Sequence, residues 1–299
     1  MYIVYLIFTV LVFSTMEVAG RYISGSIPPM LMTFCRFFLA SLFLLPFFIS
    51  RRENITKLRK TSVRELSVIS LIGILNVVLS MGLLQIAVHR GNASIPAIMI
   101  SSNPLFIYII LFAWGLERDK FVLLRIIAGI IGITGIILFN DHSSLDNPLP
   151  ALIFSIGASL IFAIYTILAR RYVLRYGNLF VTTISFLAGS LIYIPLILIF
   201  EGFTPALFTH PNPLILLYMG IVVTGAGYLS YFRGLKYVKA SRGSIVFFLK
   251  PVFALIFSII LLGESFKYIQ VVFLILIILS LFPRIRRKHH AVHYADSKN

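Results

Sequence analysis

The stretch SIVFFLKPVFALIFSIILLGE, residues Ser244–Glu264, places a lysine and a proline inside an apolar run long enough to cross a bilayer once. A charged side chain at membrane depth is costly, and a proline removes one backbone hydrogen bond from a helix. A second stretch, SIPAIMISSNPLFIYIILFAWGLE at Ser94–Glu117, repeats this frame 147 residues earlier. The two stretches predict a chain made of two related halves.

Other matches between the halves keep the same order along the chain. RFFLASLFLLP at Arg36–Pro46 matches SFLAGSLIYIP at Ser185–Pro195 with an offset of 149, and AGRY at Ala19–Tyr22 matches ARRY at Ala169–Tyr172 with an offset of 150. The offset of 147 is shared by four identical pairs: Ala93 and Ala240, Ser94 and Ser241, Pro104 and Pro251, and Glu117 and Glu264. Ordered matches with small drifts in offset indicate an internal repeat whose loops differ in length.

The composition indicates a helical membrane protein. Of 299 residues, 59% are hydrophobic and only 12% are charged, whereas soluble domains carry about a quarter charged residues. The apolar residues form blocks of about 20, which is the length of a spanning helix, and they do not alternate as in a membrane barrel. With one cysteine, Cys35, the chain can form no intrachain disulfide and no cysteine-cluster metal site.

Ten spans are predicted, which gives an all-α membrane protein. They are Tyr2–Gly20, Met30–Ile49, Leu66–Ile86, Ser94–Ala113, Phe121–Phe139, Ala151–Ala169, Leu179–Phe200, Pro213–Phe232, Gly243–Leu262 and Tyr268–Phe282.

The positions of the cations predict the orientation. If the N-terminus is cytoplasmic, 21 of the 26 Lys and Arg residues lie in cytoplasmic joints or the C-terminal tail, and only Arg21, Arg90 and Lys267 lie outside. Loops rich in Lys and Arg stay in the cytoplasm, so both termini are predicted to be cytoplasmic. The net charge of +16 is then an orientation signal, and no nucleic-acid partner is expected. The basic tail would contact anionic membrane lipid.

The joint at 141–150 has no Lys or Arg and contains turn-forming residues, so it is the predicted external linker between repeats 1–140 and 151–283, with a cytoplasmic tail at 284–299. Each repeat has five spans, an odd number, so the second repeat enters the membrane in the opposite sense. Inverted repeats of this kind are frequent in secondary transporters, whose sites lie where the repeats meet near the midplane.

The frame resembles that of the drug/metabolite transporter superfamily, and specifically its EamA-type branch. The resemblance rests on the pattern Ala240–Ser241, Pro251 and Leu262–Gly263–Glu264, on its first-repeat copy with Leu116 before Glu117, and on Arg36 within FCRFFLA. It covers nearly the whole chain, from Ile3 to Pro283. It implies ten helices in two repeats, alternating access, and a central cavity lined by spans one to four and six to nine.

Three ionisable residues lie within spans and are the primary candidates for solute binding or coupling: Lys250, Glu17 and Arg36. Such residues are expensive in a membrane and usually face a cavity or a partner. Their repeat counterparts are Asn103, Ile167 and Ser185, so each charge occurs in one half only. A site for an asymmetric solute would need this. The structural alternative is a kinked helix whose lysine is neutralised by a carboxylate.

The partner of Glu17 is left open among Arg36, Lys250 and Arg21. Depth along straight helices favours Arg36, because Lys250 would lie about 10 Å deeper at 1.5 Å per residue. Arg21 would form only a weak pair at (i, i+4). A further hypothesis is that Glu17 exchanges a proton during transport.

Polar residues within the spans are secondary candidates, although each could equally be a contact between helices. They are Asn103, Asn76, Gln85, Ser101, Ser102, Tyr165, Tyr228 and Tyr231. Pro104 and Pro251 are predicted to kink their helices. One acid and two bases facing one cavity would favour an anionic or zwitterionic solute, since arginine grips carboxylate or phosphate.

The sequence therefore predicts a secondary carrier of a small metabolite (an amino acid, organic anion or drug-like solute), with export favoured over import. A plasma membrane is expected, with a bacterial inner membrane as the specific location. The chain has no phosphate-binding GxxxxGK[ST] motif, and no enzymatic activity or cofactor is expected. Alternatives are an intramembrane enzyme or lipid-handling protein and a non-transporting sensor. Monomer and homodimer are both left open.

Overall fold

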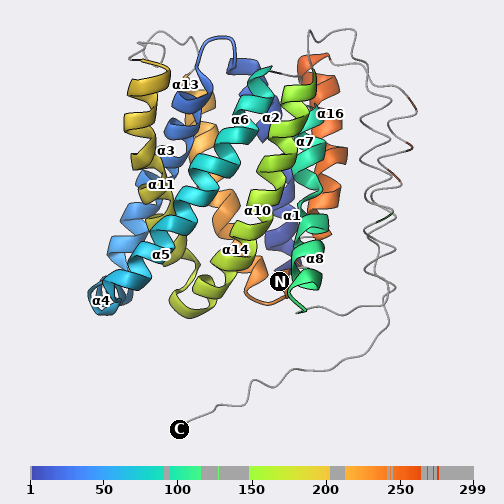
Figure 1. Ribbon diagram of the computed structural model, residues 1–299. Helices are drawn as coiled ribbons and strands as arrows, with labels where there is room; N and C mark the ends of the chain where they lie inside the picture. The colour runs from blue at the N-terminus through green and yellow to red at the C-terminus, as the bar shows by residue number, and fades with distance from the viewer. Residues whose placement is uncertain are drawn as a thin grey trace.

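The computed structural model describes residues 2–90, 94–115, 127, 148–202, 213–240, 243, 245–263, 268, 272 and 275, and these form a bundle of helices (Figure 1). Seven helices in this part of the chain are long and apolar enough to cross a membrane. They are Tyr2–Ile23, Pro29–Ser50, Val63–Arg90, Pro96–Ala113, Leu149–Tyr176, Asn178–Phe200 and Pro213–Leu235.

The seven helices correspond to predicted spans one to four and six to eight. The ninth is represented by a shorter helix, α16 (Lys250–Leu262). Most of the fifth span and most of the tenth lie outside the described residues, as do Glu117 and Glu264. The count of ten therefore stays a prediction.

Most spans are interrupted helices. In chain order the elements are α1 (Tyr2–Ser14), α2 (Met16–Ile23), α3 (Pro29–Ser50), α4 (Arg52–Lys60), α5 (Val63–Ile74), η1 (Leu75–Ser80), α6 (Met81–Arg90), α7 (Ser94–Ser101), α8 (Asn103–Ala113), α10 (Pro148–Tyr176), α11 (Asn178–Phe200), α13 (Pro213–Leu217), η3 (Tyr218–Ala226), α14 (Gly227–Leu235), η4 (Ile245–Leu249) and α16. Segments η1 and η3 are π-helical, and η4 is a 3-10 helix.

Polar side chains satisfy backbone carbonyls in both π-helical segments. The hydroxyl of Tyr193 on α11 donates to the carbonyls of Val77 and Val78 in η1, each at 3.1 Å. In η3, Thr224 donates to the carbonyl of Met219 at 2.7 Å. Irregular backbone is tolerated at membrane depth only where such partners are present. Single π turns often mark functional positions in helices.

The two halves of the chain meet along α3 and α11, which pack against each other. Helix α3 also packs on η3, and α11 on α5. Two glycines 147 residues apart permit these close approaches. A Cβ on Gly73 would lie 2.1 Å from the carbonyl oxygen of Ser185, and one on Gly220 would lie 2.6 Å from the Cβ of Leu39. The same offset thus recurs in the packing.

The helix ends lie at two opposite ends of the bundle. One end of the bundle contains the start of α1, helix α4, the turn between α10 and α11, and the end of α14 (Figure 1). Helix α10 runs toward the end at which α1 begins, so the two helices run in opposite directions. Helix α4 and the last turn of α10 carry basic residues and lie at this end, whereas the ends of α2 and α6, whose last turns contain Arg21 and Arg90, lie at the other.

Candidate functional site

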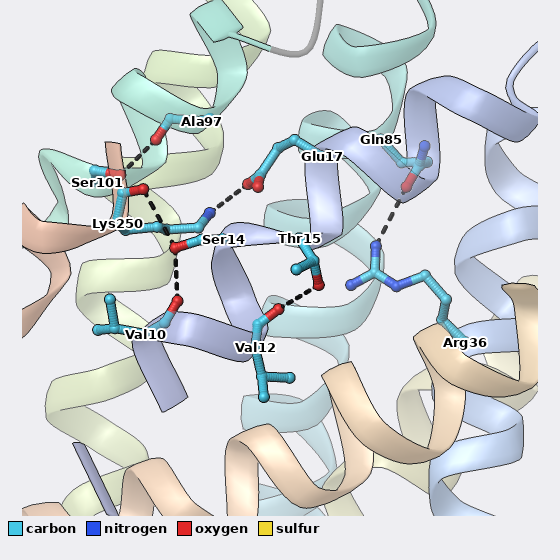
Figure 2. Close-up of polar contacts among 10 residues, drawn as sticks. All are labelled: Val10, Val12, Ser14, Thr15, Glu17, Arg36, Gln85, Ala97, Ser101 and Lys250. Carbon is cyan, nitrogen blue, oxygen red and sulfur yellow. Dashed lines mark hydrogen bonds and ion pairs between the residues drawn. The ribbon is translucent and has the colours of Figure 1, made fainter. Parts of the chain in front are cut away.

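Lys250 lies at a helix break in the interior of the bundle. It is the first residue of α16, directly after η4, and it is 2% exposed. Its ammonium forms an ion pair and a hydrogen bond with the carboxylate of Glu17 (Figure 2). Ser14 donates its hydroxyl to the carbonyl of Lys250 at 3.2 Å, so the end of α1 is tied to the start of α16.

Glu17 lies in α2 and is completely buried. The expectation from depth that it would pair with Arg36 is wrong. That expectation assumed straight helices, but the first span breaks at Thr15 and the ninth begins as a 3-10 segment with a longer rise per residue. The Arg21 alternative also fails, since the Arg21 guanidinium donates to the carbonyl of His89 at 3.3 Å.

Arg36 lies in α3, 1% exposed, and forms no ion pair with any carboxylate of the described residues. Its Nη1 donates to Oε1 of Gln85 at 3.2 Å, and its guanidinium lies 5.5 Å from the ring centroid of Phe37. Its Nε has no hydrogen-bond partner. Two buried cations, Arg36 and Lys250, thus lie in the described part of the bundle, and of these two only Lys250 is neutralised by a carboxylate there.

Arg36 and Lys250 both line one small cavity. Its volume is about 20 Å³, enough for a water molecule and too small for a metabolite. The other lining residues are Phe13, Met16, Met81, Leu84, Ile100, Phe162, Val223, Tyr228 and Phe247. Residues from both halves of the chain thus line this space.

Tyr228 belongs to the cavity wall, and Asn76 lies behind it. The amide of Asn76 in η1 donates to the hydroxyl oxygen of Tyr228 at 3.5 Å. Tyr165 and Tyr231 are fully buried but do not line the cavity. Their rings pack against other aromatic side chains, with Tyr231 5.0 Å from Phe247 and Tyr165 6.3 Å from Tyr228. These two predicted residues support the wall from behind.

Asn103 lies at the other helix break, as the first residue of α8. Its amide donates to the carbonyl of Ser159 on α10 at 3.3 Å, and it does not line the cavity. Ser101 and Ser102 donate to the carbonyls of Ala97 and Met99, both in α7.

Pro104 and Pro251 are the second residues of α8 and α16. Each proline thus lies in the first turn of a helix that follows a break, where its missing N–H has no helical partner to lose.

The apolar part of the wall was not predicted. Phe13, Phe162 and Phe247 face the cavity, but the chain has 27 phenylalanines and nothing in the sequence separates these from lipid-facing ones. The helical position of Phe13, one turn before Glu17, was the only available signal.

Several buried polar atoms near the charged residues have no hydrogen-bond partner. They are Oε2 of Glu17, Nε of Arg36, Oδ1 of Asn76, Nε2 of Gln85 and Oδ1 of Asn103. Buried polar atoms are almost always paired with protein, water or ligand. This cluster therefore offers hydrogen-bonding capacity beyond what the protein itself uses.

The chain matches the model of the EamA-like transporter family over residues 1–141 and 149–283. An uncharacterized transporter of Clostridium kluyveri is 29% identical, covering 92% of this chain and 90% of its own length. The uncharacterized inner membrane transporter YicL of Salmonella typhimurium is 27% identical, covering 79% of this chain and 78% of its own length. YedA of Escherichia coli K12, also named an uncharacterized inner membrane transporter, is 26% identical, with coverage of 81% and 77%.

A crystal structure superposes with a TM-score of 0.70 at 16% identity, covering 93% of this chain and 94% of that one. At this identity the likeness shows the fold alone. The matches together establish a membrane protein of transporter type.

Proposed function

Because the chain belongs to the EamA-like transporter family, we propose that it is a secondary active transporter that moves a small metabolite across the plasma membrane by alternating access, with export favoured over import. The observation that carries the proposal is the buried Lys250–Glu17 pair beside the Arg36 cavity. Buried charges without a structural need are costly, and in membrane proteins they mark solute and ion pathways.

An inverted pair of five-helix repeats would supply the moving parts. Three observations support it: both helix breaks, at Asn103 and Lys250, and both packing glycines, Gly73 and Gly220, are separated by 147 residues, and α1 and α10 run in opposite directions. The repeats are proposed as 1–140 and 151–283. Both termini are proposed to be cytoplasmic, since the cations of α4 and α10 gather at the end where α1 begins.

The ion pair joins the two proposed repeats, because Glu17 belongs to the first and Lys250 to the second. Rocking one repeat against the other would open the cavity to one side of the membrane and strain or separate this pair. A charge pair separated in a low-dielectric interior loses several kcal/mol unless a solute, water or a proton compensates it. Proton uptake by Glu17 is one such compensation, and it would couple transport to the proton gradient.

Flux into proteoliposomes tests the proposal. We expect uptake or exchange of at least one component of a metabolite mixture by the wild type, and complete loss in Glu17→Gln and in Lys250→Ala at normal expression. Arg21→Gln is the matched control, since Arg21 reaches only the carbonyl of His89 and should leave flux near wild type. Wild-type flux in both site variants would overturn the assignment of the site, and absence of flux for every solute would overturn transport itself.

A further inference from the structure

We infer that the solute is a monovalent anion with an apolar, flat body, and that its anionic group binds Arg36. This inference rests on the proposed function and names the substrate class of the same cavity. It is argued from the charge, the hydrogen-bonding sense and the shape of the cavity wall.

The charge of the site is unbalanced by one unit. Lys250 is neutralised by Glu17, whereas the polar and cation–π partners of the Arg36 guanidinium among the described residues are a neutral amide and an aromatic ring. All three charged side chains are at most 2% exposed. A buried cation without a counterion is strongly unfavourable, so one negative charge from a solute would complete the site. A second negative charge would in turn be uncompensated.

The polar groups on the cavity wall are donors. They are the guanidinium of Arg36, the ammonium of Lys250 and the hydroxyl of Tyr228. The Tyr228 oxygen accepts from Asn76, so its own hydrogen is available for donation. Glu17, which could accept from a solute ammonium group, is not part of the wall. The wall is therefore suited to a carboxylate or similar oxyanion and offers no counterion to an amine.

Arg36 is the better partner of the two cations. Its Nε is buried and unpartnered, and guanidinium presents N–H groups in a planar fork that matches a carboxylate. Lys250 already has an internal carboxylate, which a solute would first have to displace. The solute is thus expected to bind Arg36 directly and Lys250 only secondarily.

Aromatic side chains form the apolar part of the wall. Phe13 and Phe247 are stacked with centroids 5.9 Å apart and an interplanar angle of 19°, and Phe162 meets Phe247 edge-on at 6.0 Å. Rings in these arrangements pack well against another flat group. Since the cavity is now about 20 Å³, the body of the solute would enter as these faces separate.

Binding of four compounds that share one body tests the charge. The probes are 3-phenylpropionate (anion), phenylalanine (zwitterion), 3-phenylpropylamine (cation) and 3-phenylpropanol (neutral), with affinity measured on the purified full-length protein by calorimetry in detergent. We expect the anion to bind at least about 10-fold more tightly than each of the other three probes. One charge-assisted hydrogen bond accounts for a factor of about 10 in affinity. Tighter binding of the zwitterion, the amine or the alcohol would overturn the inference, as would binding of no probe.

Variants test the position of the anionic group. Arg36→Gln should lower the affinity for the anion to that for the alcohol. Arg36→Lys should keep part of the preference for the anion over the alcohol. Arg21→Gln should leave both affinities unchanged. If Arg36→Gln does not fold, Arg36→Lys and Tyr228→Phe should each still lower the affinity for the anion and leave that for the alcohol unchanged. An anion preference unaffected by all Arg36 and Tyr228 changes would contradict the assignment.

The flux assay separates failure of the inference from failure of the proposed function. Transport of an amine that depends on Lys250 would contradict the inference of an anionic solute and would be consistent with the proposed transporter function. Specific binding of the anion with no flux of any solute would contradict the proposed transporter function and would be consistent with the inferred anion site.

Discussion

Two helix breaks, one in each half of the chain, have the same frame and different chemistry. At the first, Asn103 begins α8 and donates to the carbonyl of Ser159 on α10. At the second, Lys250 begins α16 and binds the carboxylate of Glu17 on α2. Both side chains reach across to the opposite half, and a proline follows each of them. The two breaks therefore share their position and their proline. They differ in the polar contact, which is a neutral hydrogen bond to the backbone at Asn103 and a buried ion pair at Lys250.

The difference separates a feature that the architecture explains from one that the proposed function would explain. The first break combines a proline with a polar partner for the side chain before it, and the neutral Asn103 is sufficient for that. A buried ion pair is seldom the most stable choice, because apolar residues of similar volume are often as good or better. Lys250 and Glu17 thus cost stability that the Asn103 break does not, and the adjoining cavity gives them a role.

Breaking the ion pair has the largest expected effect. Lys250→Met leaves Glu17 buried and unpaired, so we expect a loss of about 3–5 kcal/mol in the free energy of unfolding. The double variant Glu17→Gln/Lys250→Met should recover most of this loss. Equilibrium unfolding in mixed detergent micelles measures both. If the double variant were as unstable as the single one, the two charges would not be coupled.

The packing glycines provide the next comparison. Gly73→Ala places a Cβ against backbone, at 2.1 Å from the Ser185 oxygen, whereas Gly220→Ala meets a side chain, at 2.6 Å from the Cβ of Leu39. Neither atom can rotate away, because a Cβ is fixed by its own backbone, so the closer approach decides the order: we expect about 3 kcal/mol for Gly73→Ala and about 2 kcal/mol for Gly220→Ala. The same unfolding assay ranks them, and a reversed order would show that the halves do not pack as described.

Arg21 of AGRY and Arg170 of ARRY, which are not counterparts at the offset of 150, differ in the strength of their contacts. Arg170 donates from Nε to the carbonyls of Leu235 and Val238, each at 3.1 Å, and from Nη2 to Val238 at 2.8 Å. Arg21 makes one exposed bond of 3.3 Å to His89. We expect Arg170→Gln to cost about 2 kcal/mol and Arg21→Gln less than about 1 kcal/mol, as hydrogen bonds from charged groups are the stronger ones when partly buried. Equal costs would contradict the view that the number and length of these hydrogen bonds set what each arginine contributes to stability.

The smallest effect is expected at the neutral break. Asn103→Ala removes one hydrogen bond of 3.3 Å, so we expect a loss of about 1 kcal/mol in stability and flux within a few-fold of the wild type. Proteoliposome flux, normalised to protein content, measures this. Loss of flux as complete as in Lys250→Ala would place Asn103 in the site as well.

The spans and the buried charges could be predicted from the sequence for physical reasons. A bilayer requires about 20 apolar residues per helix, so seven of the predicted spans appear as continuous or interrupted helices. Lys250, Glu17 and Arg36 were identifiable because ionisable residues are rare at membrane depth. The offset of 147 also predicted that Asn103 and Lys250 would occupy equivalent positions, and both begin a helix.

The pairing and the wall could not be predicted. Choosing a partner for Glu17 required its depth, and the break at Thr15 changes that depth without a proline or glycine at the break itself to signal it. Tyr228 and Tyr231 are three residues apart on α14, yet only Tyr228 lines the cavity. Which of two neighbouring aromatic faces meets a cavity depends on the rotation of the helix, and an apolar sequence hardly constrains that rotation.

Accessibility of the cavity from the two sides of the membrane tests the central claim most directly. In a Cys35→Ser background, Met81→Cys places a thiol on the cavity wall, where residue 81 is buried. A membrane-impermeant maleimide applied to right-side-out or to inside-out vesicles then reports which side the cavity reaches. We expect slow labelling from both sides, reduced by 3-phenylpropionate. Labelling from one side only, or from neither, would contradict alternating access through this cavity.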